Sequence, residues 1–292
     1  MANFDLLELP DGRQLEYCVS GPKGGPALLF HHGTPGACTQ IRGLAAGAHR
    51  FGLRFVTSSR AGYGASSRNP GRRIADVTDD IAHLLDALGI ERCLVAGWSG
   101  GGPHALACGA RLAGRVRAVL VIAGVAPSGI PGLDFLAGMG EANLAEFAAA
   151  AKGEDALRPF LVAEQEGLAS ITADALAEGM ASLLSSADLV ALAGGLDEDL
   201  VAQLRHGTGQ SIDGWLDDDL AFLTDWGFSV DDVTVPTTLW QGSDDLMVPF
   251  SHGRWLAGHV PGAVSHLVDG EGHVSIAANA DRLLSELVAL GA

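Results

Sequence analysis

The chain has 292 residues, of which 48% are hydrophobic, and a formal net charge of −17 at pH 7. This length and composition predict a globular protein that buries a substantial core, either as one large domain or as a domain with an insertion. The acidic balance argues against a nucleic-acid partner, which would require a basic face.

The first ten residues contain Asp5 and Glu8, so we do not expect them to form the charged-then-apolar leader of a secreted protein. Uncharged apolar runs stay shorter than the roughly 18 residues that a membrane span needs. Four cysteines lie far apart, without C-x-x-C spacing. We therefore expect a cytoplasmic protein with free thiols and no membrane partner. The sequence leaves its oligomeric state open.

The negative charge is concentrated in residues 128–235, which hold 20 acidic and three basic side chains. Acidic and basic side chains balance each other in the rest of the chain. This asymmetry predicts that residues 128–235 form a separate unit.

Strand patterns dominate the first part of the chain. Alternating residues at 5–9 and 13–19, on either side of Asp11-Gly12, predict an antiparallel hairpin. Short apolar runs predict buried parallel strands at 27–30, 54–57, 93–96 and 118–122. Helical periodicity predicts helices at 77–88 and 103–112.

Residues 128–235 show helical stretches, such as 141–151 and 173–184, and no convincing strand. Strands return at 237–240 and 264–268, with helices near 252–257 and at 275–290. This alternation predicts an α/β parallel sheet that is split by a helical insertion. The predicted domains are a core of residues 1–127 and 236–292 and an acidic helical unit of residues 128–235.

One serine lies in a run of glycines directly after a predicted strand. The stretch from Val95 to His104 reads VAGWSGGGPH, which places Ser99 in the pattern G-x-S-x-G. With 40 glycines in the chain, these five positions alone are weakly specific. A strand before Ser99 and a helix after Gly100 supply the context of a strained nucleophile elbow. Ser99 is therefore the predicted nucleophile.

Acyl transfer also needs a base near the nucleophile and an acid that orients the base. His273 lies in a glycine-containing loop just beyond the predicted strand at 264–268. Asp244 and Asp245 follow the strand at 237–240, and the spacing to Gly242 and to Val248-Pro249 favours Asp245. Groups beyond the carboxyl ends of parallel strands converge on one crevice.

A tetrahedral oxyanion requires two preorganised donors, usually backbone N–H groups. Residues 31–36 (HHGTPG) follow the predicted strand at 27–30 and can supply the N–H of Thr34. Gly100, next to the nucleophile, can supply the other N–H. Trp98 and His32 are the residues that we expect to line the substrate pocket.

Four parts of the sequence resemble the α/β-hydrolase family. They are residues 32–36, similar to its oxyanion loop, 60–66, similar to the turn after its next strand, 97–101, similar to its elbow, and 242–249 with 272–273, similar to its acid and histidine loops. The resemblance covers nearly the whole chain outside the insertion.

The resemblance implies an α/β-hydrolase fold with a Ser99, Asp245 and His273 triad and a helical cap over the site. It also implies hydrolysis of an ester, amide, lactone or similar bond of a small molecule, without a cofactor. A small carboxylic ester is the expected substrate, and we expect no metal.

Two other motifs are weaker. Residues 100–105 fit the dinucleotide pattern G-x-G-x-x-A, but no acid occurs between Glu91 and Asp134, so the expected ribose-binding carboxylate is missing. Histidines recur every seven residues from His252 to His273. Pro261 and the strand after it put them on different elements, so this spacing does not predict a metal site.

The acids at 217–219 and elsewhere in the insertion are expected to provide solubility. A sharper hypothesis is that a negative cap attracts cationic substrates to Ser99. Proline iminopeptidases of this family hold a free amino terminus with cap acids, and their oxyanion loop resembles residues 32–36, although Thr34 replaces their usual second glycine. An aminopeptidase is therefore the second hypothesis. A small-molecule receptor with little turnover is the third.

Overall fold

The computed structural model describes residues 4–292, apart from the side chain of Ala169. Its centre is one sheet of eight strands in the order β1-β2-β4-β3-β5-β6-β7-β8. The strands are β1 (Asp5–Glu8), β2 (Gln14–Ser20), β3 (Ala27–His31), β4 (Arg54–Ser58), β5 (Cys93–Trp98), β6 (Val116–Ile122), β7 (Thr237–Gly242) and β8 (Val264–Val268).

Strand β2 is antiparallel to both β1 and β4, and the remaining pairs are parallel. The turn between β1 and β2 contains Gly12 with a φ of 85°, a backbone conformation that favours glycine. The predicted mostly parallel α/β sheet with an N-terminal antiparallel hairpin is confirmed.

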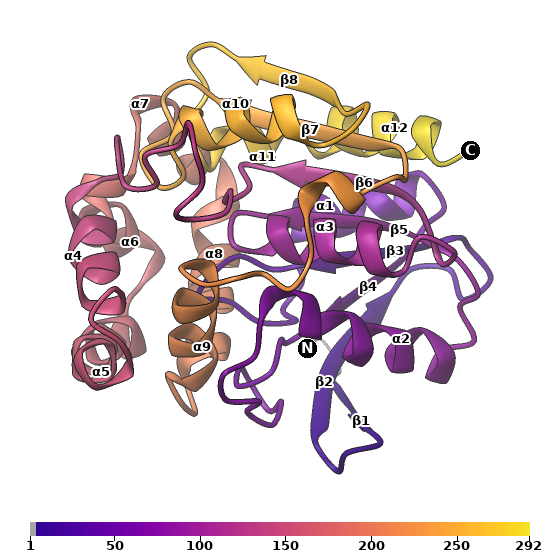
Figure 1. Cartoon of the computed structure of the whole chain (residues 1–292), viewed down its shortest axis with the longest axis horizontal. Helices are drawn as coiled ribbons and strands as arrows, with labels where there is room; N and C mark the ends of the chain where they lie inside the picture. Colours follow the sequence, from indigo (N-terminus) through magenta and orange to yellow (C-terminus); the bar gives the residue numbers. More distant parts are fainter. Residues whose placement is uncertain (1–3) are drawn as a thin grey trace.

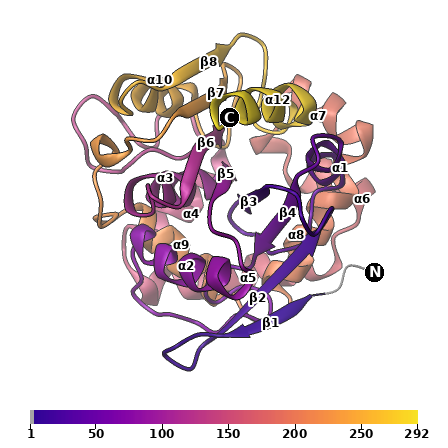
Figure 2. The same ribbon diagram turned by 90° about the vertical axis from the view of Figure 1, so that its right-hand side faces the viewer.

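Helices cover both faces of the sheet, as Figure 2 shows, with α2, α3 and α10 on one side and α1 and α12 on the other. Side chains of β3 alternate accordingly: Leu29 lies in one core, and Leu28 and Phe30 lie in the other. The bounds of these helices are α1 (Arg42–Arg50), α2 (Val77–Ala87), α3 (Gly101–Arg111), α10 (Phe250–His259) and α12 (Ala280–Leu290).

The acidic stretch 128–235 is helical throughout its regular structure and contains no strand. In Figure 1 most of its helices gather beside the sheet, on the left. The helices are α4 (Glu141–Ala150), α5 (Glu154–Ser170), α6 (Ala173–Gly179), α7 (Ser186–Ala191), α8 (Asp197–Thr208) and α9 (Asp213–Phe222). The division of the chain into a core and a cap at residues 128 and 235 stays a prediction.

Two helices differ from the expectations. Helix α1 was not predicted, because its segment contains two glycines and few large apolar residues. The predicted closing helix is broken at Asn279, between α11 (Ser275–Ala278) and α12. Asn279 has a non-helical ψ of 63°, and its side chain accepts the N–H of Arg282 at 3.3 Å, so it caps the second helix.

Within residues 4–292, none of the helices combines the length and apolar character needed to cross a membrane.

Candidate active site

Ser99 lies in a sharp turn between β5 and α3, with a φ of 58°. Few non-glycine residues adopt this left-handed conformation, and they are often found at functional sites. Its neighbours must be glycines: a Cβ on Gly97 would overlap the carbonyl oxygen of Gly101, and a Cβ on Gly101 would overlap that of His31. The sequence pattern around Ser99 is therefore required by close backbone packing.

Asp245 and His273 follow β7 and β8 and are both buried. His273 Nδ1 lies 2.8 Å from Asp245 Oδ2. The other carboxylate oxygen, Oδ1, accepts the backbone N–H groups of Met247 and Val248 at 2.9 and 2.8 Å. These bonds fix the carboxylate so that it orients the imidazole. Asp244 is exposed and accepts a hydrogen bond from the Ser243 hydroxyl instead.

The His273 loop is held from two further sides. The indole N–H of Trp98 donates to the His273 carbonyl oxygen at 3.1 Å, and the two rings stack with centroids 5.5 Å apart. Asp188, on α7, accepts the N–H groups of Val274 and Ser275 at 2.7 and 2.9 Å. Residues from the sheet and from the acidic helices therefore both position this loop.

The predicted oxyanion residues lie beside each other, since a Cβ on Gly100 would overlap Thr34 Oγ1. Within residues 4–292 neither the Thr34 N–H nor the Gly100 N–H donates a hydrogen bond. Gly100 also precedes the first residue of α3, so its N–H lies at the positive end of the helix dipole. The two N–H groups therefore have no acceptor among the described residues, as a predicted oxyanion site requires.

Arg60, in the turn after β4, holds the loop that contains Thr34. Its guanidinium donates to the carbonyl oxygens of His32 and Gly33 at 2.6 and 3.0 Å and to Thr34 Oγ1 at 3.0 Å. The carboxylate of Asp218, on α9, lies 2.6 Å from Arg60 Nη2 and accepts the Thr34 hydroxyl at 2.7 Å. One buried ion pair thus links the acidic helices to the loop.

The expectation that the acids at 217–219 only provide solubility is wrong for these three residues. Asp217, Asp218 and Asp219 are 3%, 0% and 1% exposed. Burial opposes ionisation of Asp218, but Arg60 and Arg72 outweigh it and hold its pKa well below the usual range. Asp218 is therefore a buried carboxylate between two guanidinium groups.

A cavity of about 220 Å³ opens between the sheet and the acidic helices. Ser99, His273, Thr34, Gly100 and Trp98 all line it. His32 lies outside the lining: it is buried, its Nδ1 bonds to the Gly33 carbonyl at 2.7 Å, and its Nε2 accepts the Arg60 N–H at 3.2 Å. Burial and the charge of Arg60 hold the pKa of His32 well below its usual range, so it is a neutral residue that supports the loop.

Comparison with known families now decides the assignment. The model of the alpha/beta hydrolase fold family matches residues 26–280. The chain belongs to this family.

Curated relatives match shorter stretches. An uncharacterized hydrolase of Bacillus subtilis is 36% identical over 107 residues, which cover 37% of this chain and 37% of the relative. A 3-oxoadipate enol-lactonase of Acinetobacter baylyi is 30% identical over 112 residues, which cover 38% of this chain and 41% of the relative. The chain thus spans well under two thirds of the length of these relatives.

Solved structures agree over the whole chain at low identity. An esterase from Exiguobacterium antarcticum is 17% identical with a TM-score of 0.69, covering 100% of this chain and 99% of the other. The enol-lactonase from Burkholderia xenovorans is 21% identical with a TM-score of 0.67, covering 98% and 99%. These similarities establish a shared alpha/beta hydrolase fold.

The other regularly spaced histidines of this alpha/beta hydrolase lie apart from one another. His252 is buried and bonds to the Ala126 N–H and the Phe135 carbonyl at 3.1 and 2.8 Å. His259 stacks on Trp255, and His266 lies 2.9 Å from Glu286. The seven-residue spacing therefore does not bring these histidines together in one site.

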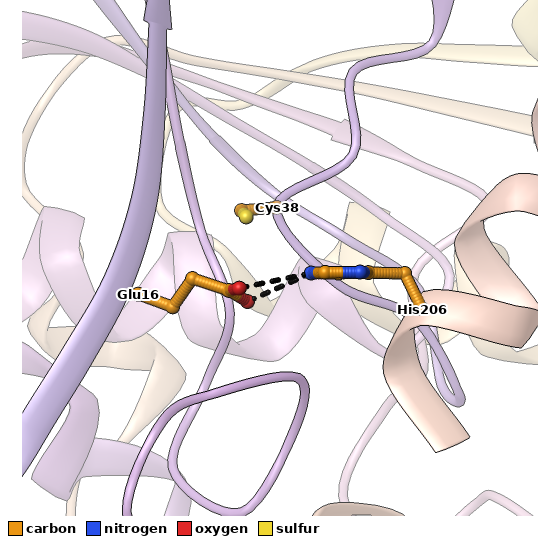
Figure 3. Close-up of side chains that lie close together, drawn as sticks. All are labelled: Glu16, Cys38 and His206. Atoms are coloured by element: carbon orange, nitrogen blue, oxygen red, sulfur yellow. Dashed lines mark hydrogen bonds and ion pairs between the residues drawn. The ribbon is translucent and has the colours of Figure 1, made fainter. Parts of the chain in front are cut away.

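One His/Cys/carboxylate cluster among residues 4–292 has the spacing of metal ligands: Glu16, Cys38 and His206, with ligand atoms within 4.8 Å of one another. Figure 3 shows the Glu16 carboxylate facing the His206 imidazole, with Cys38 to one side. His206 Nε2 lies 3.0 Å from both Glu16 oxygens, and the Ser59 hydroxyl donates to Glu16 at 2.6 Å. Burial raises the pKa of the Cys38 thiol, so it is not a ready thiolate ligand. Within this cluster, the contact between His206 and Glu16 joins α8 to β2.

Sequence reasoning missed the positioning residues Arg60, Asp188 and Asp218. Leu216 and Leu220 lie four residues apart on one face of α9, and the three acids between them occupy the rest of the helix circumference, where all of them could face solvent. The sequence therefore carries no signal that Asp218 is buried. Asp188 has no signal either, because its contact with the His273 loop depends on how α7 folds back.

Proposed function

We propose that this protein is a serine hydrolase that cleaves a small carboxylic ester with Ser99 as nucleophile, His273 as base and Asp245 as orienting acid. One observation carries the proposal: a single cavity is lined by Ser99, held in a strained turn, and by His273, paired with the buried Asp245. The ester preference is supported by relatives that are described as an esterase and as enol-lactonases.

The proposed reaction has two halves. Ser99 Oγ attacks the ester carbonyl carbon while His273 Nε2 takes the hydroxyl proton, and the alcohol leaves with that proton. Water then attacks the acyl-enzyme, again giving its proton to His273. The carboxylic acid departs, and the proton returns to Ser99 Oγ. Asp245 keeps Nδ1 of His273 protonated, so that Nε2 is the free base in each half.

The N–H groups of Thr34 and Gly100 are the proposed donors to the oxyanion. Arg60 and Asp218 hold the Thr34 loop in place before substrate binds, so little reorganisation is needed when charge develops. We also propose that residues 128–235 act as a cap over Ser99, since Glu146, Trp215 and Phe222 from this region line the cavity.

The first experiment compares wild type with Ser99→Ala and His273→Ala on short-chain p-nitrophenyl esters and on proline and alanine p-nitroanilides. We expect ester turnover to fall by about 10³-fold or more in each variant, while each variant keeps the fold. Turnover that survives in Ser99→Ala would refute the mechanism. Tight ligand binding without turnover would favour a receptor, and a preference for the anilides would favour an aminopeptidase.

A further inference from the structure

The cavity beside Ser99 is lined by three carboxyl groups, those of Glu146 on α4, Glu164 on α5 and Asp219 on α9. No lysine or arginine belongs to this lining in the described part of the chain. Asp219 is 1% exposed, Glu146 is half-buried, and Glu164 is exposed. Asp219 is therefore the buried acid of the cavity, and Glu146 is partly buried beside it.

The carboxyl groups of Glu146 and Asp219 are close enough for each to influence the ionisation of the other. The indole N–H of Trp215 donates to Glu146 Oε1 at 2.7 Å, which favours the ionised form of Glu146. Burial and the neighbouring Glu146 hold the pKa of Asp219 well above its usual range, with a smaller contribution from Asp218. Burial also raises the pKa of Glu146. The pair therefore holds a proton more readily than two exposed carboxyl groups would.

One oxygen of this pair lacks a donor. Asp219 Oδ2 is buried and accepts no hydrogen bond from residues 4–292. The nearest guanidinium groups are engaged with other acids, since Arg60 and Arg72 both pair with Asp218. A buried carboxyl oxygen without a donor costs free energy, so packing alone does not account for this arrangement.

The pair lies close to the nucleophile turn. Asp219 stands one helical turn before Phe222, on the same face of α9. Phe222 reaches that turn, because a Cβ on Gly100 would lie 2.9 Å from Phe222 Cζ. Ser99, Glu146 and Asp219 also line one cavity, so a group carried by an ester bound at Ser99 can approach the two carboxyl groups.

We propose that the Glu146 and Asp219 pair binds a positively charged amino group of the substrate, so that the cavity selects cationic esters over neutral and anionic ones. This inference rests on the proposed ester hydrolysis at Ser99. An ammonium group brings three N–H donors and a positive charge. It supplies the donor that Asp219 Oδ2 lacks and offsets the repulsion between two carboxylates. Because the ammonium charge favours the ionised form of both carboxyl groups, we expect binding to release a proton to solvent.

The test uses p-nitrophenyl esters in isosteric pairs: alaninate against isobutyrate, and 6-aminohexanoate against heptanoate. Within each pair, the ammonium group of one ester is replaced in the other by a methyl group at the same distance from the carbonyl carbon. We expect the ratio of kcat/KM for the ammonium ester to that for its alkyl partner to fall at least tenfold in Glu146→Gln and in Asp219→Asn. Alkyl-ester turnover in the same variants measures any general effect on the cavity, and the ratio corrects for it. Rates in Ser99→Ala serve as the background.

Glu166→Gln is the matched control, because Glu166 is an exposed acid of α5 outside the cavity lining. The kcat/KM ratio of Glu166→Gln should equal that of wild type. This result would show that the effect comes from the two cavity acids and not from the negative charge of the whole protein. Unchanged ratios in the two cavity variants, with alkyl-ester turnover intact, would overturn the proposal.

A second measurement needs no variant and no turnover. Calorimetry of wild type with n-butylammonium, in two buffers of different ionisation enthalpy, should detect binding with release of a proton, while butyrate should not bind. Absence of butylammonium binding would overturn the proposal even if esters are hydrolysed. Binding without hydrolysis of any ester would instead refute the proposed function and leave the amino-group site standing.

Discussion

Arg60 Nη2 and Asp218 Oδ2 lie 2.6 Å apart, with the two side chains 1% and 0% exposed. Arg72 Nη1 lies 2.7 Å from the second oxygen of the same carboxylate, and Tyr63 donates its hydroxyl at 2.9 Å. One carboxylate thus balances two guanidinium groups away from water. Since Arg60 also holds the Thr34 loop, the stability of the fold and the geometry of the proposed oxyanion site depend on the same contact.

Asp218→Asn should destabilise the protein strongly. Removing one partner of a buried ion pair leaves an uncompensated charge, which costs about 3 to 5 kcal/mol, and here two guanidinium groups lose their counter-ion. Asp217→Asn is the control, because its partner Arg68 is partly exposed and also lies near Glu154 and Asp213, so it keeps other partners when Asp217 is changed and the loss should be smaller. Urea unfolding measures both. Equal losses would contradict a central role of Asp218.

The pKa of Asp218 lies well below its usual range, so wild type should gain stability from this group above pH about 4, the pKa of an unfolded aspartate. That gain is lost as pH falls through the folded pKa. Stability of Asp218→Asn should therefore decline less than that of wild type below pH about 4. Parallel acid unfolding curves for the two proteins would speak against an ionised Asp218.

Asp219 should show the opposite dependence. Because its pKa is raised, the folded protein binds more protons than the unfolded chain above pH about 4, so stability is lost as pH rises through the folded pKa. Asn at this position does not titrate and can donate an N–H to Glu146. The free energy of unfolding of Asp219→Asn should thus fall less than that of wild type between pH about 4.5 and about 7.5. Urea titrations at both pH values test this, and an identical fall would rule out a protonated Asp219.

Asp245→Asn should lower ester turnover by about 10³-fold or more, because the amide no longer holds Nδ1 of His273 in the protonated form. Asp244→Asn removes an exposed neighbour that bonds to Ser243, and turnover should stay within about twofold of wild type. Steady-state kinetics on one p-nitrophenyl ester compares them. Comparable mild losses of turnover in both variants would contradict the assignment of Asp245 as the orienting acid.

The sheet was predictable because buried parallel strands are short apolar runs, and β3, β5 and β6 show this pattern. The triad could be predicted because Ser99, Asp245 and His273 each follow a predicted strand, in the order of nucleophile, acid and base. The contacts of the acidic helices could not be predicted in the same way. Whether Asp218 faces Arg60 or water depends on how α9 packs against the sheet. The composition of this segment predicts a helix but not the way in which the helix packs. The same limit hid the contact between Glu146 and Asp219.

Gly101→Ala tests whether the glycines of the nucleophile turn serve close packing. A Cβ on Gly101 would overlap the carbonyl oxygen of His31, at the base of the Thr34 loop. Such overpacking costs about 1 to 3 kcal/mol, and the displaced loop should lower ester turnover at least tenfold. Urea unfolding and steady-state kinetics measure the two effects.

Gly43→Ala is the matched control, because Gly43 also lies near the start of a helix, α1, and a Cβ there meets no atom within 4 Å. Alanine is the better helix former by up to about 1 kcal/mol, so this variant should be as stable as wild type or more stable, with unchanged turnover. If Gly101→Ala matched it in both measurements, the turn would tolerate a side chain, and close backbone packing would not explain the glycines on either side of Ser99.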